Sequence, residues 1–386
     1  MKISCTQENL NQGLFVVSHI ASKNTALPIL NNVLIQANDN SIKLSATNLE
    51  IGVTCLIRGK VETEGDFTVQ SRLLADYVAL LPKDRVDLDV IGGSKNESEL
   101  GDILNITCKN HSTKIKGQPA TDFPLIPQLE RKNLYVVDCQ KFRQAISQVI
   151  LAVSVSETRP EINGVLFNFN SDSLILAATD SYRLAEKTIA LDKKTKNESQ
   201  KVIVPSRTLQ ELQRILSSFK DPAALEEIEN IKIYLSDNQI LFALDSIELI
   251  SRLVEGQYPD YQQIIPQQSN TKITLSVPEF INAIKTTSLF ARSGIYDVNL
   301  EFDSAKKETT VSSANNQLGE NVSKVSSEIT GDNNSIVVNY RYLLDGLQNI
   351  DSNQISIDVI DSASPCVLKA SGKDSDYLYI IMPIKQ

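Results

Sequence analysis

The sequence predicts an α+β fold with antiparallel sheets, built from three tandem copies of one unit. The main observation is a strand-to-helix segment that occurs three times, as VQSRLLADYVALL (69–81), VPSRTLQELQRIL (204–216) and VNYRYLLDGLQNI (338–350). The fourth residue of each copy is an arginine, at Arg72, Arg207 and Arg341, and the copies are spaced by about 135 residues. Solenoid repeats have periods of about 20–50 residues, so each copy here is a whole domain.

The flanking segments repeat as well, and they predict the elements of each copy. A hairpin pattern recurs as NNVLIQANDNSIKLSATN (31–48), NGVLFNFNSDSLILAATD (163–180) and, more loosely, DVNLEFDSAKKETTVSSAN (297–315). A helical segment precedes each hairpin, at 8–22, 140–154 and 278–292. The alternation in SIKLSAT and NIKIYLS is typical of strands with one buried face. Each copy therefore reads helix, hairpin, strand, helix and further strands.

Polar segments that begin with proline separate the copies. They read PQLERKN at 127–133 and PQQSNTK at 266–272, and such composition is typical of connections between domains. The predicted domains are residues 1–128, 129–267 and 268–386.

The repeated second helix has an apolar face and a basic one. In the middle copy the apolar residues recur at helical spacing, at Leu209, Leu212, Ile215 and Leu216, and should pack on the sheet. Arg207 and Arg214 lie seven residues apart on another face, and further cations stand on the first helices, at Lys141, Arg143, Lys285 and Arg292. Each cation alone is typical of a solvated helix face, but their recurrence favours a shared basic surface.

Composition narrows the class of function. The chain has 386 residues, five scattered cysteines without a CxxC pair and two histidines, so we expect neither a metal site nor a cofactor. It has no run of eighteen apolar residues and no apolar signal segment at its start, so we expect a cytoplasmic protein without membrane contact. The net charge of −9 argues against a basic surface overall, although only the face that meets a partner matters.

Five motifs resemble one known family. They are LPIL (27–30), ATDSYRLA (178–185), VIVPSR (202–207), LVEGQYPDYQQIIP (253–266) and YIIMPIKQ (379–386). Together with the threefold repeat, and in order along the whole chain, they resemble the bacterial DNA polymerase III beta subunits, the sliding clamps. The resemblance implies DNA-clamp domains with sheets outside and two helices per domain inside. It also implies a homodimer that closes into a ring around duplex DNA, a processivity factor with no chemistry of its own.

The resemblance implies a set of positions that face the DNA. Together with Arg341, which the repeat adds, they are Lys23, Asn24, Arg72, Arg207, Arg214 and Arg341. The family often has arginine where Asn24 stands, and two tyrosines where Pro160 and Glu161 stand. A ring that slides should make few contacts, none of them to specific bases.

The resemblance also implies an apolar cleft between the second and third domains. There the family binds short peptide motifs of the polymerase III catalytic subunit, the clamp loader, other polymerases and repair proteins. The matching positions are Ile162, Thr179, Ser181, Tyr182, Arg183, Leu184, Pro259, Gln263, Ile264, Ile295, Ala363, Pro365, Ile380, Ile381, Met382, Pro383 and Ile384. Gln263 stands where arginine is frequent and Tyr182 where histidine is, which should shift peptide preference. The final strand alone is equally typical of an ordinary core strand.

The dimer contact implied by the family joins the first domain of one chain to the third domain of the other. By position, Thr113 and Ile115 pair with Leu289 and Phe290. The family often has an aromatic residue where Thr113 stands, and Leu289 and Phe290 also fit the core side of the helix at 278–292.

Two alternatives remain at this point. An enzyme could use Asp180 with Arg183, or Asp260 beside Tyr258 and Tyr261. No carboxylate pair, phosphate-binding loop or metal-ligand spacing accompanies these residues, so the sequence predicts that the protein is not an enzyme. A protein-interaction scaffold that does not bind DNA agrees with the sequence pI of about 5.0, and the molecular size in solution separates it from a ring.

Overall fold

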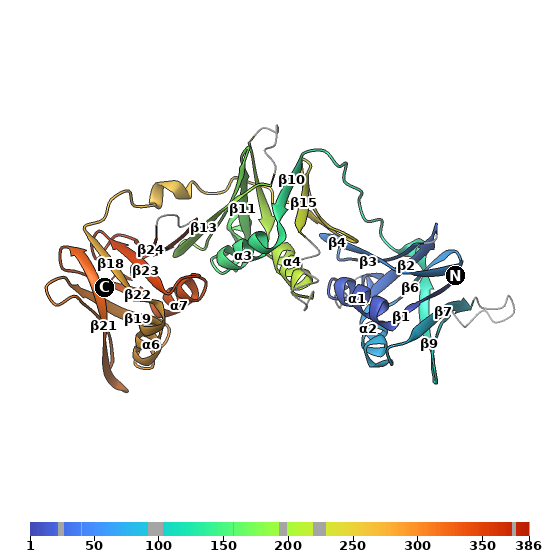
Figure 1. Cartoon of the computed structure of the whole chain (residues 1–386), viewed down its shortest axis with the longest axis horizontal. Helices are drawn as coiled ribbons and strands as arrows, with labels where there is room; N and C mark the ends of the chain where they lie inside the picture. The colour runs from blue at the N-terminus through green and yellow to red at the C-terminus, as the bar shows by residue number, and fades with distance from the viewer. Residues whose placement is uncertain are drawn as a thin grey trace. The chain divides into compact units, whose positions relative to one another are not determined.

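The computed structural model describes residues 1–21, 27–39, 41–91, 103–156, 158–192, 199–218, 229–372 and 376–385. It divides into two compact units. The first comprises Met1–Gln140 and Gln210–Leu253, and the second comprises Lys141–Leu209 and Val254–Gln386. The middle sequence repeat is therefore shared between the two units. Within the described residues each unit holds one sheet, of 13 strands in the first and 12 in the second (Figure 1).

The sheet of the first unit combines the first repeat with half of the second. In spatial order its strands are β10 (Leu134–Asp138), β15 (Asn230–Leu235), β16 (Gln239–Leu244), β17 (Ile247–Arg252), β4 (Ile51–Ile57), β3 (Ser41–Thr47), β2 (Asn32–Asn38), β6 (Gly65–Gln70), β9 (His111–Pro119), β8 (Ile103–Cys108), β7 (Arg85–Ile91), β1 (Lys2–Thr6) and β5 (Gly59–Thr63). The helices of the first repeat are α1 (Gln7–Ser18) and α2 (Ser71–Leu80), with short 3₁₀ turns η1 (Pro28–Asn31) and η2 (Ala120–Asp122). All the strand pairs are antiparallel, as predicted.

The sheet of the second unit combines the other half of the second repeat with the third. Its order is β14 (Gln200–Pro205), β11 (Gly164–Phe169), β12 (Ser173–Thr179), β13 (Arg183–Ala190), β25 (Tyr377–Ile381), β24 (Cys366–Ala370), β23 (Gln354–Val359), β18 (Thr271–Ser276), β21 (Gly319–Gly331), β20 (Glu308–Asn315), β19 (Asp297–Asp303) and β22 (Asn334–Asn339). The helices of the third repeat are α6 (Val277–Ser288) and α7 (Tyr340–Gln348). Those of the second repeat are α3 (Cys139–Ile150) and α4 (Ser206–Ser218), and 3₁₀ turns lie at η3 (Pro160–Ile162) and η4 (Tyr261–Ile264).

The strand register shows that the three copies share one backbone plan. The strand that opens each hairpin pairs with the strand that leads into the second helix, through Asn32↔Gln70, Gly164↔Pro205 and Asp297↔Asn339. The residues that follow Gln70, Pro205 and Asn339 begin α2, α4 and α7. The sequence alignment of the three segments is therefore also an alignment in space.

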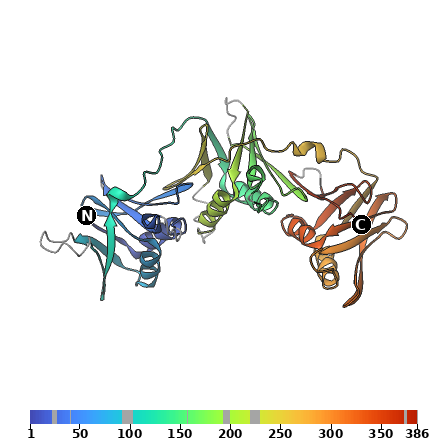
Figure 2. The same ribbon diagram turned by 180° about the vertical axis from the view of Figure 1, so that it is seen from behind.

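In the first and third repeats, two helices lie together against the sheet. Figures 1 and 2 show α1 beside α2, and α6 beside α7, each pair on one side of its strands. The predicted apolar face of α4 is confirmed, because Leu209, Leu212 and Ile215 are fully buried. Side chains cap two of the helices, since Thr6 accepts a hydrogen bond from the Asn9 N–H and Asn339 from the Arg341 N–H. Within the described ranges, no helix is long and apolar enough to cross a membrane.

Neighbouring repeats are joined by strand pairing. In the first unit β17 of the second repeat pairs with β4 of the first, with Leu249 opposite Val53. In the second unit β25 of the third repeat pairs with β13 of the second, with Ile380 opposite Leu184. Both junctions therefore use the last strand of one repeat and the equivalent fourth strand of the repeat before it.

Candidate nucleic-acid and partner interfaces

The three repeated arginines occupy one structural position, in the first turn of the second helix of each repeat. Arg72, Arg207 and Arg341 are all exposed. The Arg72 side chain is 80% exposed, and the nearest carboxylate oxygen, of Asp76, lies 4.0 Å away. A cation in the first turn gains nothing from the helix dipole, which favours anions there. The placement of these arginines is therefore not explained by helix stability.

Two of the predicted DNA-facing positions, and two positions that depart from the family pattern, lie away from the repeated second helices in the sequence. Lys23 and Asn24 lie outside the described residues. Pro160 and Glu161 form the short turn η3, and the Glu161 carboxylate accepts a hydrogen bond of 3.3 Å from Arg159 Nε.

Arg214 is engaged by protein groups. Its guanidinium donates to the main-chain oxygens of Phe15 and Val16, at 2.8 and 2.7 Å, and to the Glu211 carboxylate. It also lies 4.9 Å from the centre of the Phe15 ring. The last four carbonyls of a helix have no partner within that helix, and Arg214 satisfies two of those at the end of α1. Because its donors are occupied in this way, we do not include Arg214 among the residues proposed to contact DNA.

Glu211 connects the second repeat to the first through a further contact. The Nδ1 atom of His19, just past α1, lies 2.7 Å from Oε2 of Glu211, whose side chain is only 5% exposed. Asp345 occupies the equivalent position on α7, and it too binds a side chain of the preceding repeat. Neither acid is recognisable as an inter-repeat contact from its own sequence neighbours.

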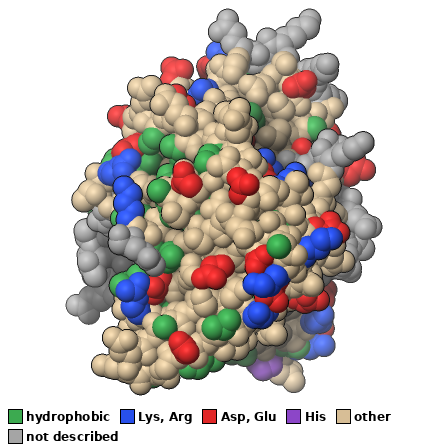
Figure 3. Space-filling model, turned by 90° about the vertical axis from the view of Figure 1, so that its left-hand side faces the viewer, with side chains coloured by type: hydrophobic (Ala, Val, Ile, Leu, Met, Phe, Trp, Pro, Cys, Tyr) green, Lys and Arg blue, Asp and Glu red, His purple; other side chains and the backbone are tan. Residues whose placement is uncertain are grey.

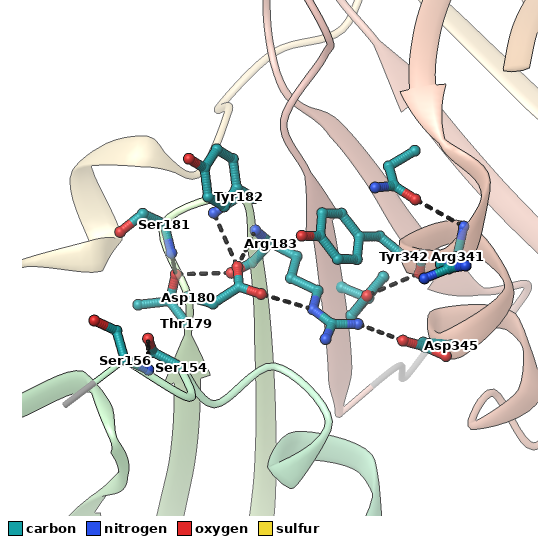
Figure 4. A network of polar contacts seen from close by, with 12 residues as sticks. Ser154, Ser156, Thr179, Asp180, Ser181, Tyr182, Arg183, Arg341, Tyr342 and Asp345 are labelled. Atoms are coloured by element: carbon teal, nitrogen blue, oxygen red, sulfur yellow. Dashed lines mark hydrogen bonds and ion pairs between the residues drawn. The ribbon is translucent and has the colours of Figure 1, made fainter. Parts of the chain in front are cut away.

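The cation that reaches Asp345 is Arg183 (Figure 4). Its Nη1 lies 2.5 Å from Asp345 Oδ2, its Nε lies 3.0 Å from Asp180 Oδ2, and the guanidinium is 4.4 Å from the centre of the Tyr342 ring. The side chain is only 12% exposed. Burial opposes the charge, but Tyr379 and the two carboxylates outweigh it and hold the pKa of Arg183 above its ordinary value.

The turn before Arg183 is shaped by local hydrogen bonds and by one strained residue. Oδ1 of Asp180 accepts from the N–H groups of Tyr182 and Arg183, at 2.9 and 3.0 Å. Ser181 has φ of +78°, a left-handed conformation that residues other than glycine rarely adopt. The turn leaves the Tyr182 ring 63% exposed. Asp180 therefore has a structural role here.

Two tyrosines of the connecting segment hold it against the second repeat. The Tyr258 hydroxyl accepts a hydrogen bond of 3.0 Å from the Thr179 N–H, and the Tyr261 hydroxyl donates one of 2.5 Å to Glu186 Oε2. Burial raises the pKa of both phenols. Asp260 between them is exposed and accepts from the Gln263 amide at 2.8 Å. These hydrogen bonds fix the connecting segment against the sheet.

The structure brings the predicted cleft residues together only in part. Ile162, Leu184 and Ile380 belong to one buried cluster, with Ile264 packed against it. Ile381 is also fully buried, while Thr179 is 7% exposed. The chain ends beside them, since the Met382 N–H donates to Tyr182 O and the Ile384 N–H to Val337 O, both at 2.8 Å. The core reading of the final strand therefore applies to Ile380 and Ile381.

The remaining predicted residues lie around that cluster or apart from it. Those that are exposed or half-exposed beside the junction are Ser181, Tyr182, Pro259, Gln263, Met382, Pro383 and Ile384. Ala363 and Pro365 lie in the loop between β23 and β24. Ile295 is 42% exposed in the segment between α6 and β19. The junction here is the pairing of β13 with β25. We call the following residues beside it the junction rim: Ser181, Tyr182, Pro259, Gln263, Ala363, Pro365, Met382, Pro383 and Ile384.

The four predicted dimer residues are divided between β9 and the end of α6. Thr113 is half-exposed and Ile115 only 6% exposed on β9. Leu289, immediately after α6, is 71% exposed, and Phe290 is half-buried.

Charge on the face drawn in Figure 3 is mixed. Basic and acidic side chains lie next to one another there, and no continuous basic patch is visible. This agrees with the net charge of −9.

The sequence of the chain matches one family of known proteins over nearly its whole length. Models of the N-terminal, central and C-terminal domains of the DNA polymerase III beta subunit match residues 1–127, 136–260 and 262–385. The chain belongs to the DNA polymerase III beta subunit family. It is 30% identical over 374 residues to the beta sliding clamp of Staphylococcus epidermidis, which is 94% of each chain.

Solved structures of clamps share the fold over the whole chain. The sliding clamp of Bacillus subtilis is 26% identical with a TM-score of 0.90, and the beta subunit of Thermotoga maritima is 25% identical with a TM-score of 0.89. Each comparison covers 100% of this chain and 99% of the other. The chain thus has three DNA-clamp domains and is a processivity clamp of DNA replication, an accessory subunit and not a catalytic one. Dimer and ring follow from membership of this family.

Proposed function

We propose that two copies of the chain close head to tail around duplex DNA, and that the ring tethers DNA polymerase III through the junction rim. The observation that carries this proposal is that one pair of strand edges is left open by the repeat. The two junctions inside the chain use β4 with β17 and β13 with β25. The counterpart of β4 and β13 in the third repeat is β21, and the counterpart of β17 and β25 in the first repeat is β9.

Among the described strands, part of β9 and part of β21 each have one unpaired edge. In the described part of the chain, residues 111–116 of β9 pair only with β8, and residues 319–326 of β21 pair only with β20. An open strand edge presents unpaired N–H and C=O groups to another chain. We pair β21 of one copy with β9 of the next, in the same way as the strands at the junctions inside the chain. Two copies form two such junctions, and together they complete a closed ring of six domains.

The second helix of the first repeat has an exposed face that supports the same contact. One side of α2 carries Leu73, Asp76 and Leu80. Leu73 is 49% exposed, Leu80 is 85% exposed, and the Asp76 side chain is 74% exposed. Their counterparts on α4 are Thr208, Glu211 and Ile215, which are at most 4% exposed. Their counterparts on α7 are Tyr342, Asp345 and Asn349, which contact Arg183 and Gln148 of the second repeat. Among the described residues, this face has a neighbour from another repeat on α4 and α7 but none on α2.

The partner surface can be assigned by the same alignment. The residues of α1 that meet the second repeat are Phe15, Val16 and His19. Their counterparts at the end of α6 are Lys285, Thr286 and Leu289, all exposed. We therefore place Leu289 of one copy against the α2 leucines of the next, with Lys285 near Asp76. Apolar and opposite-charge groups face each other in this arrangement.

Duplex DNA is proposed to contact Arg72, Arg207 and Arg341, together with Lys23 and Asn24. Binding to phosphates weakens steeply with salt, by about 0.9 per neutralised phosphate on logarithmic axes. A closed ring on circular DNA stays in place regardless, as long as its junctions hold. The domains proposed for the ring are residues 1–128, 129–267 and 268–386, and this division is supported by family models that match residues 1–127, 136–260 and 262–385. We place the protein in the cytoplasm.

The junction rim is proposed to receive short peptide motifs of the polymerase III catalytic subunit, the clamp loader, other polymerases and repair proteins. It combines aliphatic side chains, one methionine and an exposed tyrosine next to a fully buried apolar cluster. Such a surface suits aliphatic and aromatic peptide anchors. A tethered polymerase has a high effective concentration at the primer end.

One experiment tests the encirclement. The protein is loaded onto nicked circular DNA by a clamp loader with ATP, washed in high salt, and the DNA is then linearised. We expect retention on circles and release after cutting, because only a topological link depends on the ends. Equal release from both forms contradicts the proposal.

A second experiment tests the rim. Met382→Asp with Ile384→Asp should abolish polymerase stimulation while the dimer and DNA retention stay intact. Leu125→Asp is the matched control, since Leu125 is 96% exposed in the segment after η2 and is not one of the predicted cleft positions. Stimulation that survives the double substitution contradicts the assignment of the rim.

A further inference from the structure

The strand-to-helix corner of the third repeat differs in chemistry from its two counterparts. In the second repeat Asn163 and Ser206 meet there, with a main-chain bond from Ser206 N to Asn163 O of 3.2 Å and a side-chain bond of the same length. In the third repeat the same main-chain bond joins Tyr340 N to Tyr296 O at 2.8 Å. The first repeat has Asn31 and Ser71. Two small polar residues are thus replaced by two tyrosines only in the third copy.

These tyrosines enclose the repeated arginine. The Arg341 guanidinium carbon lies 3.5 Å from the centre of the Tyr296 ring, well within the range of a cation–π contact. The Tyr296 and Tyr340 rings meet edge to face, with centres 6.0 Å apart at 84°. The two tyrosines also hold the pKa of Arg341 above its ordinary value. The guanidinium is therefore held on one face by the Tyr296 ring.

The equivalent arginines are not held in this way. Arg72 is 80% exposed, and within the described ranges its one ion pair is with the Asp76 carboxylate, at 4.0 Å. For Arg207, no side-chain hydrogen bond or ion pair is found among the described residues. Arg341 nevertheless remains accessible, since it is exposed and both tyrosines are half-exposed. The third corner therefore presents a cation that is ordered before any ligand arrives.

We propose that Tyr296, Tyr340 and Arg341 form a pre-ordered phosphate site of the third domain, which binds the DNA backbone more tightly than Arg72 or Arg207 do. Arginine binds phosphate oxygens through paired N–H donors, and stacking on a ring leaves those edges free. Immobilising a long side chain on binding weakens affinity by about 2- to 12-fold, and at Arg341 the tyrosines have already ordered it. Tyr296 and Tyr340 are positioning residues. This inference rests on the proposed DNA-facing role of Arg341.

The test gives the strand-to-helix corner of the third repeat the residues found at the corner of the second repeat. The variant Tyr296→Asn with Tyr340→Ser keeps Arg341 and recreates the residues found at 163 and 206. Binding of the full-length protein to a fluorescent duplex of about 20 base pairs is measured by anisotropy, across a salt series. We expect the dissociation constant to rise about 2- to 10-fold with an unchanged salt slope, because the charge is retained. Arg341→Ala should raise it at least as much and lower the slope by about 0.9.

Matched arginine variants complete the test. Arg72→Ala and Arg207→Ala should each weaken binding less than Arg341→Ala, and in the Asn/Ser background the loss from Arg341→Ala should fall to the level of Arg72→Ala. If the double variant folds poorly, Tyr296→Leu keeps the bulk and removes the ring face, and it should weaken duplex binding in the same direction.

Three results overturn the inference. The first is unchanged duplex affinity in the double variant although Arg341→Ala weakens binding, which leaves the encirclement itself intact. The second is a loss confined to single-stranded DNA of the same length, which assigns the rings to base stacking. The third is no effect of Arg341→Ala on affinity. Failure of the encirclement is distinguished from all three, because it appears as release of the unmodified protein from circular DNA in high salt.

Discussion

The exposed leucine of α2 offers the sharpest test of the proposed ring contact. Leu80 is 85% exposed in the single chain, whereas its counterpart Ile215 is fully buried. Full burial of a leucine is worth about 1.5–3 kcal/mol, and a two-junction ring buries two copies of Leu80. Leu80→Ala removes three of the four side-chain carbons, so we expect it to weaken association by about 2–4 kcal/mol. That corresponds to a rise of about 30- to 1,000-fold in the dimer dissociation constant.

The measurement is the mass of the protein in solution over a dilution series, by sedimentation or light scattering. The matched control is Leu125→Ala, since Leu125 is 96% exposed in the segment that follows η2 but lies outside the proposed contact. The stability of the single chain should change little in either variant, because substitutions at exposed positions usually do. A dissociation constant for Leu80→Ala within threefold of the parent refutes the assignment of the α2 face to the ring contact.

Three further predictions concern the second unit. Arg183→Met should lower the free energy of unfolding by about 3–5 kcal/mol in urea denaturation, because it leaves a nearly buried carboxylate without its cation. Asp345→Asn, at a side chain that is 45% exposed, should lose only about 1 kcal/mol, and equal losses would contradict this ordering. Ser181→Gly should raise the melting temperature slightly, since relief of the left-handed conformation is worth about 1–2 kcal/mol against about 0.5–1 kcal/mol of added chain entropy. Burial alone would raise the pKa of Asp297, but Arg292 and main-chain N–H groups outweigh it and leave the pKa lowered. The stabilisation from this carboxylate is therefore present at neutral pH and lost as pH falls below about 4, so the difference in stability between the parent and Asp297→Asn should shrink over that range.

The sequence predicted those parts of the fold that depend on neighbours along the chain. Leu209, Leu212 and Ile215 recur at helical spacing, and helical spacing alone places them on one side of α4. The alternation in 41–47 likewise predicts the buried Ile42 and Leu44 of β3. Because each pattern occurs three times, agreement among the copies separates the signal from chance.

Contacts between repeats could not be predicted in the same way. Arg214 looks like any cation on a solvated helix, yet its partners are carbonyls about 200 residues earlier in the chain. The carboxylates of Glu211 and Asp345 bind side chains that come from different elements. One is His19, just past α1, and the other is Arg183, at the start of β13. The repeat does align these acids with Asp76, and that alignment is the one signal in the sequence that could have pointed to the junctions.

The residues at positions 73, 76 and 80 of α2, and their counterparts on α4 and α7, form the junction face of the second helix. The chemistry of this face differs between junctions inside one chain and the proposed junction between two chains. At the two junctions inside the chain the face is polar apart from Ile215, with Glu211 bound by His19 and Arg214, and Asp345 bound by Arg183. A covalent tether supplies a high effective concentration there, so polar pairs that add little net free energy are sufficient. The junction between two copies has no tether and must overcome the loss of translational and rotational freedom. Burial of apolar surface is the largest favourable term available for that purpose. This accounts for Leu73, whose counterparts are Thr208 and Tyr342, and for Leu289, whose counterpart in the first repeat is His19. Replacing the leucines of α2 by the polar residues of α7 should therefore leave the fold of the chain intact and abolish only its association.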